Sequence, residues 1–208
     1  MLSHKKSLNI LKKTDALIDG HFVLSSGLHS SKYIQCAKLL SFPHLSKKIC
    51  ISLSKKIKKN FNKIDLILSP AIGGIVIGYE IGRLLKKETI FCERVKGKFK
   101  IRRGFNIKKK AKVLIVEDVI TTGKSSIECV KLIKKSHAKL VGFACIIDRS
   151  DQKTLKIKQK IVSQIKIHAP LYKKNLLPDF IKKIKISKPG SRYTKWKDLE
   201  LTLTMLLL

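Results

Sequence analysis

Two adjacent carboxylates, Glu117 and Asp118, lie between an apolar segment and a turn rich in hydroxyl groups. The turn contains Thr121, Thr122, Gly123, Lys124, Ser125 and Ser126. If a helix begins there, its unpaired N–H groups and its dipole favour an anion, and Gly123 lets the backbone approach closely. A phosphate cradle beside two acids, with Mg²⁺ within reach, fits a sugar phosphate.

The hydrophobic pattern predicts the elements that hold these groups. Val113–Val116 is an apolar run without alternation, which predicts a strand buried on both faces. Carboxylates would not sit inside such a strand, so we expect Glu117 and Asp118 at its carboxyl end. A helical pattern follows the turn, with apolar residues at Ile127, Val130, Leu132 and Ile133.

Two alternatives apply to this segment. An ordinary capped helix needs a single acid or hydroxyl rather than this cluster. A nucleotide P-loop is suggested by Gly123-Lys124-Ser125, but that motif requires a glycine where Asp118 stands. The sugar-phosphate interpretation is therefore favoured over both.

A second turn of the same kind precedes the first in the chain. Asp65–Ser69 predicts another buried strand, followed by the glycine-containing turn Pro70–Gly74 and a helix through Leu85. One such turn is weak support for a phosphate site. Two turns on neighbouring parallel strands are stronger, because ligands bind where the strand order reverses.

Two further segments carry basic side chains. Residues 94–105 alternate apolar and basic residues around Gly97, which predicts either an exposed hairpin or a mobile flap over a diphosphate. Leu140–Ile147 predicts a buried strand, and Arg149 follows it. The guanidinium of Arg149 could pair with a surface acid or hold a substrate carboxylate in bidentate fashion.

The remaining segments complete an α/β pattern. We expect a helix over 3–19, two short strands in 21–40, a helix from Phe42-Pro43 to Phe61, a strand over Glu88–Cys92, one or two edge strands in 151–170, a short helix starting at Leu177–Phe180 and a turn at Pro189–Arg192. The apolar tail after Trp196 has no functional interpretation.

Length and composition limit the classes of protein to which this chain can belong. The 208 residues suit one domain with an appendage, and no apolar run is long enough to span a membrane. The net charge of +32 is spread over every segment and aromatic residues are 6% of the chain, which favours a solvated surface over a nucleic-acid footprint. The five cysteines form no CxxC pair, and the first residues lack a long apolar segment. We therefore expect reduced thiols in a cytoplasmic protein.

From about residue 8 to residue 192 the chain resembles the bacterial orotate phosphoribosyltransferases, which belong to the type I phosphoribosyltransferases. Glu117-Asp118 with Thr121–Ser125 resembles the superfamily signature for 5-phosphoribosyl 1-diphosphate. The closer resemblance is carried by His21–Ser30, by Glu93-Arg94 with Arg102–Phe105, by Asp148–Ser150 and by Pro189–Arg192.

The resemblance implies a fold and a domain division. The fold would be α/β, a Rossmann-like parallel sheet with a small N-terminal hood subdomain. Residues 1–192 would form one phosphoribosyltransferase domain, with a core over about 43–150 and a hood from about 1–40 plus the C-terminal segment. Residues 193–208 would be an unassigned tail.

The resemblance also implies roles for individual residues. Arg94 and Lys98 would be catalytic. The expected binding residues for 5-phosphoribosyl 1-diphosphate are Glu117, Asp118, Val119, Ile120, Thr121, Thr122, Gly123, Lys124, Ser125, Arg94, Lys98 and Lys100. The pyrophosphate would face Pro70, Ala71, Ile72 and Gly73. Orotate would contact Thr121 and Arg149, with Tyr33 near its ring.

The implied reaction is the Mg²⁺-dependent transfer of the phosphoribosyl group to orotate in pyrimidine biosynthesis, with the metal held mostly by the diphosphate substrate and water. The protein would be a homodimer with shared active sites, and neither nucleic acid nor a membrane would be a partner. Many relatives carry Lys where Ser25 stands and a second basic residue where Val95 stands, and some carry His where Lys100 stands.

Two alternative functions are a purine phosphoribosyltransferase and a non-catalytic regulator that binds 5-phosphoribosyl 1-diphosphate. A purine has no carboxylate to need Arg149. A regulator could lose the basic loop, yet residues 94–100 are intact.

Overall fold

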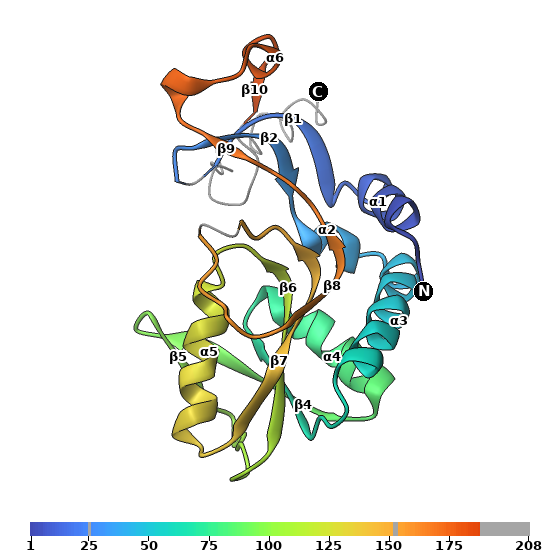
Figure 1. Ribbon diagram of the computed structural model, residues 1–208, viewed down its shortest axis with the longest axis vertical. Coiled ribbons are helices and arrows are strands. Elements are labelled where there is room, and N and C mark those ends of the chain that lie inside the picture. The colour runs from blue at the N-terminus through green and yellow to red at the C-terminus, as the bar shows by residue number, and fades with distance from the viewer. Residues whose placement is uncertain (25, 152–153, 188–208) are drawn as a thin grey trace, which may run out of the picture. The chain divides into compact units, whose positions relative to one another are not determined.

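The computed structural model describes residues 1–24, 26–151 and 154–187. Ser25, the expected turn Pro189–Arg192 and the tail 193–208 lie outside these ranges. The chain divides into two compact units, each of which is described by itself. The larger unit contains residues 1–17 and 35–168, and the smaller unit contains residues 18–34 and the described residues from 169 on (Figure 1).

The larger unit is built on a six-stranded sheet with the order β5-β4-β3-β6-β7-β8. Its strands are β3 (Leu66–Pro70), β4 (Glu88–Val95), β5 (Lys98–Ile101), β6 (Lys112–Ile120), β7 (Lys139–Asp148) and β8 (Ile161–Lys166). All neighbouring strands are parallel except β4 and β5, which form an antiparallel hairpin. The predicted α/β fold with a parallel sheet is confirmed.

Helices cover both faces of this sheet. They are α1 (His4–Lys13), α2 (Cys36–Leu40), α3 (Pro43–Asn60), α4 (Gly73–Leu85) and α5 (Lys124–Lys135). In Figure 1, α5 lies on one face and α3 and α4 lie on the other. The chain moves from β3 to β4 in one direction and from β6 to β7 in the other. Right-handed crossovers therefore place α4 and α5 on opposite faces.

The central strands are buried on both faces, which explains their continuous apolar runs. Ile67 and Leu68 of β3 and Val113–Val116 of β6 have no exposed surface. All five cysteines are free and buried, as expected for core thiols. No helix in the described part of the chain has the length and apolar character needed to span a bilayer.

Glu117 and Asp118 lie near the carboxyl end of their strand as expected, but inside it, because β6 continues to Ile120. Pairing between β3 and β6 ends at Leu68 and Ile115, whereas β7 stays paired with β6 as far as Ile120. The two acids therefore belong to a strand that has lost its neighbour on one side. That missing neighbour leaves room for polar side chains at this edge.

The predicted helix over 3–19 is shorter than expected, because α1 ends at Lys13 and Leu17 begins a strand. Thr14 caps the helix, with its hydroxyl donating to the carbonyl of Ile10 at 3.0 Å. Residues 21–40 contain the two expected strands and, in addition, the unpredicted α2.

The smaller unit holds a four-stranded sheet with the order β10-β1-β2-β9. Its elements are β1 (Leu17–Val23), β2 (His29–Ile34), β9 (Leu171–Tyr172), the 3₁₀ helix η1 (Lys174–Leu176), α6 (Asp179–Lys182) and β10 (Ile186–Ser187). Within it the ring nitrogens of His21 and His29 lie 2.7 Å apart. The expected hood included residues from about position 1, but the first 17 residues belong to the larger unit.

Contacts of the N-terminal segment explain this difference. Ser7 of α1 accepts a hydrogen bond of 2.8 Å from the side chain of Gln164 in β8. The backbone N–H of Leu2 donates to the hydroxyl of Ser52 in α3 at 2.8 Å. Helix α1 is therefore anchored on the larger unit.

Glycines let α4 lie with its backbone directly against the sheet. Gly74, Gly78 and Gly82 recur every four residues and so share one face of the helix. A Cβ atom at Gly78 would overlap the hydroxyl of Ser69 in β3, and one at Gly82 would overlap the hydroxyl of Thr89 in β4. This close approach fixes the position of α4 and of the turn that precedes it.

Gly78→Ala should therefore destabilise the protein, by about 1–3 kcal/mol, as overpacking does. In an unconstrained helix the same change stabilises by about 1 kcal/mol, so the sign of the effect is diagnostic. Urea unfolding would measure it. Ser69→Ala provides the control, since the Ser69 hydroxyl is buried without a hydrogen-bond partner among the described residues. Combined with Gly78→Ala it should return part of the loss, and a stabilised Gly78→Ala variant would contradict this packing.

Candidate active site

The two predicted turns meet at the edge of the sheet where the strand order reverses. Strands β3 and β6 are neighbours, but the chain leaves them towards opposite sides of the sheet. A Cβ atom at Gly73, in the turn after β3, would lie 2.8 Å from a carboxylate oxygen of Asp118 in β6. The acid pair therefore touches the backbone of the other turn. Such a position is where open α/β sheets bind ligands.

Glu117 is the buried member of the acid pair, with 7% of its surface exposed. The hydroxyl of Ser126, in the first turn of α5, donates a hydrogen bond to its carboxylate. Burial raises the pKa of Glu117 to about 7, the nearby Asp118 carboxylate adds to this shift, and the Ser126 hydrogen bond opposes it. Near neutral pH this group is thus close to the midpoint of its titration.

Asp118 lies closer to the surface of the site than Glu117. Burial raises its pKa as well, while backbone hydrogen bonds that favour the ionised form oppose the shift. Its backbone carbonyl faces the thiol of Cys36 at 3.8 Å. Its carboxylate is left facing Gly73, where it can accept hydrogen bonds from a bound polyol.

The hydroxyl-rich turn encloses a small cavity of about 80 Å³. The lining residues are Glu117, Val119, Ile120, Thr121, Thr122, Gly123, Lys124 and Ser125. Asp118 is the one predicted residue of the Glu117–Ser125 segment that does not line it, because its carboxylate points to Gly73 instead. The volume and the backbone N–H groups at the start of α5 suit a single phosphate group.

Gly123 is required by the backbone of this turn. It is the N-cap of α5 and has a φ of 72°, a left-handed conformation that favours glycine. A Cβ atom there would also lie 2.7 Å from the side chain of Ile157. The N–H of Lys156 donates to the carbonyl of Thr122 at 3.1 Å, so residues around 156 hold the turn from outside.

The turn after β3 presents backbone groups to the same edge. The N–H of Ala71 donates to the carbonyl of Cys92 in β4 at 2.8 Å, which ties the turn to the sheet. The Ala71–Ile72 peptide bond is cis. Ile72 is 86% exposed and α4 begins at Gly73. Pro70, the first predicted residue of the turn, is the last residue of β3.

Arg149 lies next to Thr121 at the end of β7. Its backbone N–H donates to the carbonyl of Ile120 at 2.8 Å. One terminal nitrogen of its guanidinium, Nη2, is buried and has no hydrogen-bond partner among the described residues. Burial lowers the pKa of Arg149. A buried cationic donor without a partner is costly, so this site favours an incoming carboxylate.

The basic hairpin lies elsewhere on the larger unit, beside α5. A surface cavity of about 670 Å³ lies where the two meet, and its lining includes Arg94, Lys98, Phe99, Glu128, Lys131 and Lys156. This cavity is larger than the one at the acids, but the two carboxyl groups whose pKa values are raised by burial and the two convergent turns are at the acids. Lys124 lines both cavities and so links them.

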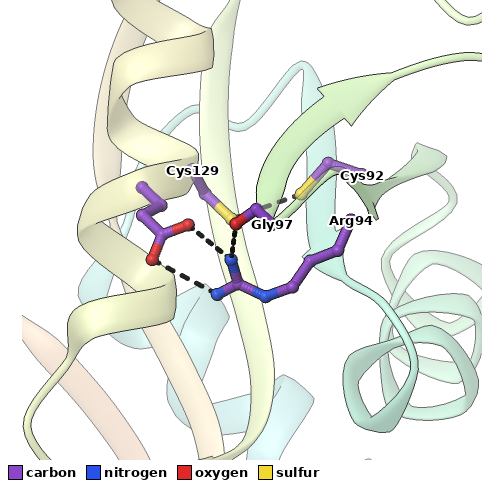
Figure 2. Close-up of polar contacts among 5 residues, drawn as sticks. Cys92, Arg94, Gly97 and Cys129 are labelled. Carbon is purple, nitrogen blue, oxygen red and sulfur yellow. Dashed lines mark hydrogen bonds and ion pairs between the residues drawn. The ribbon is translucent and has the colours of Figure 1, made fainter.

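The three basic residues predicted to act from the hairpin differ in their contacts. Arg94 forms an ion pair with Glu128 of α5, with Nη1 and Oε2 2.9 Å apart (Figure 2). Lys98 and Lys100 are exposed, and neither has an ion pair within the described ranges. The structure therefore brings together Glu117 through Ser125, Gly73 and Arg149, while Arg94, Lys98 and Lys100 form a separate basic group.

Tyr33 lies in β2 of the smaller unit, where its ring centroid is 5.6 Å from that of Phe22. Its predicted place near the orotate ring stays a prediction. Two partners were not predicted from the sequence: Ser126, which donates to Glu117, and Glu128, which pairs with Arg94. The position of Ser126 at the start of the predicted helix could have indicated its contact with Glu117. For Glu128 the sequence indicated only a place on the polar face of the predicted helix.

The chain is similar to known proteins along most of its length. Residues 42–173 match the phosphoribosyl transferase domain, so the fold and site define a phosphoribosyltransferase. An orotate phosphoribosyltransferase of Parvibaculum lavamentivorans is 42% identical over 193 residues, which cover 92% of this chain and 99% of the relative. One of Caldicellulosiruptor saccharolyticus is 42% identical over 188 residues, covering 90% and 97%. The chain therefore belongs to the orotate phosphoribosyltransferase family.

A solved structure agrees at the level of the fold. The crystal structure of orotate phosphoribosyltransferase from Aeropyrum pernix superposes with a TM-score of 0.65 at 22% sequence identity. The match covers 76% of this chain and 92% of that one.

The raised pKa of Glu117 predicts how the free energy of unfolding changes with pH. Its folded-state pKa of about 7 lies above the ordinary value of 4.5, so the folded protein holds the proton more tightly than the unfolded chain. Stability contributed by this proton falls as pH rises from about 4.5 to about 7, by about 3 kcal/mol in total. Urea unfolding at pH 5 and pH 8 should show a smaller drop for Glu117→Gln than for the unmodified protein.

Glu88→Gln, at the exposed start of β4, is the matched control for losing a carboxylate. It should leave the drop unchanged. An equal drop in Glu117→Gln and the unmodified protein would show that this carboxyl is not the buried titrating group.

Proposed function

We propose that the protein transfers the phosphoribosyl group from 5-phosphoribosyl 1-diphosphate to orotate, giving orotidine 5′-phosphate and diphosphate. The observation that carries this proposal is that three features converge at one sheet edge: a phosphate-sized cavity, a pair of acids, and a guanidinium whose buried Nη2 atom has no hydrogen-bond partner among the described residues. Membership of the orotate phosphoribosyltransferase family supports the proposal.

The substrate's phosphate would bind where α5 begins. Backbone N–H groups and hydroxyls from Thr121 to Ser125 surround the small cavity, and the helix dipole adds a favourable field. Glu117 and Asp118 would accept hydrogen bonds from the two ribose hydroxyls. The backbone of Pro70–Gly73 would face the diphosphate, because this turn lies on the other side of Asp118.

Orotate would be recognised through its carboxylate by Arg149, beside Thr121. The buried Nη2 atom gains the hydrogen bond that it lacks among the described residues. A purine offers no carboxylate at this position, so the guanidinium would stay unpaired and binding would be penalised. Tyr33 would lie near the orotate ring.

Mg²⁺ fits this site only as a partner of the substrate. Among the described residues no three His, Cys, Asp or Glu side chains are placed to hold a metal ion, whereas Asp118 offers one hard carboxylate beside the diphosphate turn. We therefore assign most of its ligands to ribose and diphosphate oxygens and water. When bound, the ion neutralises charge on the departing diphosphate.

The chain's own groups would act by positioning and electrostatics. The 5′-phosphate and ribose hydroxyls are held at fixed points, so that C1′ faces the orotate nitrogen while the diphosphate leaves. Lys98 would balance the charge that develops on the leaving group. Glu117 and Asp118 serve as anchors for the pentose rather than as general bases.

The proposal includes a homodimer with shared active sites, in which the hairpin of one subunit reaches the site of its partner. It also includes a role in pyrimidine biosynthesis in the cytoplasm, with neither nucleic acid nor a membrane as partner. The spread of lysines over every segment of the sequence supports the last point. Filter binding to RNA over a salt series would test it, because phosphate contacts weaken steeply with salt.

The direct test of the function is an absorbance assay of orotate consumption with 5-phosphoribosyl 1-diphosphate and Mg²⁺. Hypoxanthine and adenine are run beside orotate as rival acceptors. Turnover of orotate alone supports the proposal. Turnover of a purine, or binding of the diphosphate substrate without any turnover, would support one of the two alternatives instead.

Arg149→Gln should raise the KM for orotate by at least about tenfold, because a charged hydrogen bond to the carboxylate is lost. The dissociation constant of 5-phosphoribosyl 1-diphosphate, measured by calorimetry, should be unchanged. Arg83→Gln on the exposed face of α4 is the matched control and should alter neither value. An unchanged KM for orotate in Arg149→Gln would remove Arg149 from the site.

Lys98→Ala should lower kcat by about tenfold or more, because it removes a cation from the developing diphosphate charge. Steady-state kinetics in both substrates would measure this. Lys108→Ala, outside the strands of the hairpin, provides a control for the loss of one lysine. Full activity in Lys98→Ala would refute the role of the hairpin.

A further inference from the structure

The Glu117 carboxylate lies at the same small cavity as the backbone groups to which the substrate's phosphate is proposed to bind. Its side chain is buried, yet it forms part of the cavity wall. Free N–H groups at a helix N-terminus and the positive end of the helix dipole attract any anion within reach. The carboxylate is therefore a competitor of the phosphate for the donors at the start of α5.

The start of α5 has no strong acceptor among its own side chains. Gly123 is the N-cap and makes no side-chain cap bond, and the first turn of the helix contains no acidic residue. The N–H of Lys124 donates to the hydroxyl of Thr122 at 3.4 Å, which is long for a hydrogen bond. The donors at this end of the helix are therefore available to whichever anion is placed at the cavity.

Ser126 gives the Glu117 carboxylate a different donor. Its hydroxyl donates to Oε1 of Glu117, so that the bond joins α5 to β6. Ser126 has no exposed surface and does not belong to the cavity lining. The bond therefore ties one carboxylate oxygen to a residue outside the cavity wall.

This hydrogen bond differs from those of other buried hydroxyls on the helices. Ser7, Ser46 and Ser54 each donate to a backbone carbonyl three or four residues earlier in the chain. Such a local bond satisfies a buried hydroxyl without reaching another element. Ser126 instead donates to a charged side chain of a strand, which fixes the position of that side chain.

We infer that Ser126 is a positioning residue, whose hydrogen bond holds the Glu117 carboxylate off the N–H groups at the start of α5 and leaves these groups free for a phosphate. The inference rests on the proposed function for the identity of the phosphate-bearing substrate. Ser126 acts through Glu117 and would not itself touch the substrate. The same bond leaves Oε2 of Glu117 to accept a hydrogen bond from a ribose hydroxyl.

A purely structural role of Ser126 makes a different prediction. If the hydroxyl only supported the packing of α5 on β6, its loss would weaken phosphate binding whether or not position 117 is a carboxylate. If Ser126 restrains Glu117, its loss weakens phosphate binding only while the carboxylate is present. A double-mutant cycle between positions 117 and 126 separates these two roles.

The first experiment measures the dissociation constant of inorganic phosphate by phosphorus NMR titration at about pH 9, above the pKa of Glu117. Ser126→Ala should weaken binding by about tenfold, because the released carboxylate is a charged acceptor that competes for the helix N–H groups. In a Glu117→Gln background the same change should alter the dissociation constant by less than about twofold.

The control for losing a buried hydroxyl is Ser54→Ala in α3, where the hydroxyl donates to the carbonyl of Ile51 at 2.9 Å. It should leave phosphate binding unchanged. Alanine is the residue that a helix accepts best, and urea unfolding checks that each variant is folded.

Three results would overturn the inference. An unchanged affinity in Ser126→Ala shows that Glu117 does not compete for the phosphate site. An equal loss of affinity with Glu117 and with Glu117→Gln shows that Ser126 supports the helix rather than the carboxylate. Absence of phosphate binding by the unmodified protein shows that the start of α5 is not a phosphate site.

The second experiment measures turnover and so depends on the proposed function. Ser126→Ala should raise the KM for 5-phosphoribosyl 1-diphosphate by about tenfold and leave the KM for orotate unchanged, because the Glu117–Ser126 pair lies outside the proposed orotate site. An equal rise in both KM values would overturn the inference. If the unmodified protein binds phosphate but does not consume orotate, the proposed function fails, while the phosphate cycle still decides the role of Ser126.

Discussion

The reversal of strand order between β3 and β6 is the constraint on which this structure depends. Two parallel strands lie side by side, yet the chain must leave them towards opposite edges, so α4 and α5 are forced onto opposite faces. This reversal leaves an opening between the two outgoing turns. The backbone of Gly73 can meet the carboxylate of Asp118 only because of this opening.

Electrostatics at that opening follow from the fold. Glu117 lies in a strand that has lost its β3 neighbour but is still buried, and this burial keeps its pKa near 7. A buried acid, a helix N-terminus and the Arg149 guanidinium, whose Nη2 atom lacks a hydrogen-bond partner in the described part of the chain, lie at neighbouring strand ends. Each group lacks something that a phosphorylated pentose or a carboxylated base can supply.

Sequence patterns predicted the central part of the fold well, because buried parallel strands leave continuous apolar runs such as Val113–Val116 and Leu140–Ile147. They failed at Leu17, which fits helical spacing but pairs in β1, since a strand this short leaves little periodic signal. They also failed to find Glu128. Its partner Arg94 is far away in sequence, and a glutamate on a polar helix face looks like any solvated residue.

The glycines of α4 have a mechanical consequence. A helix whose glycines Gly78 and Gly82 lie this close to Ser69 and Thr89 of the sheet cannot move towards it without a clash. The position of the turn at the start of α4 is therefore fixed by the sheet. Movement during a reaction cycle must therefore occur in elements that pack through side chains. The β4–β5 hairpin at the edge of the sheet is such an element.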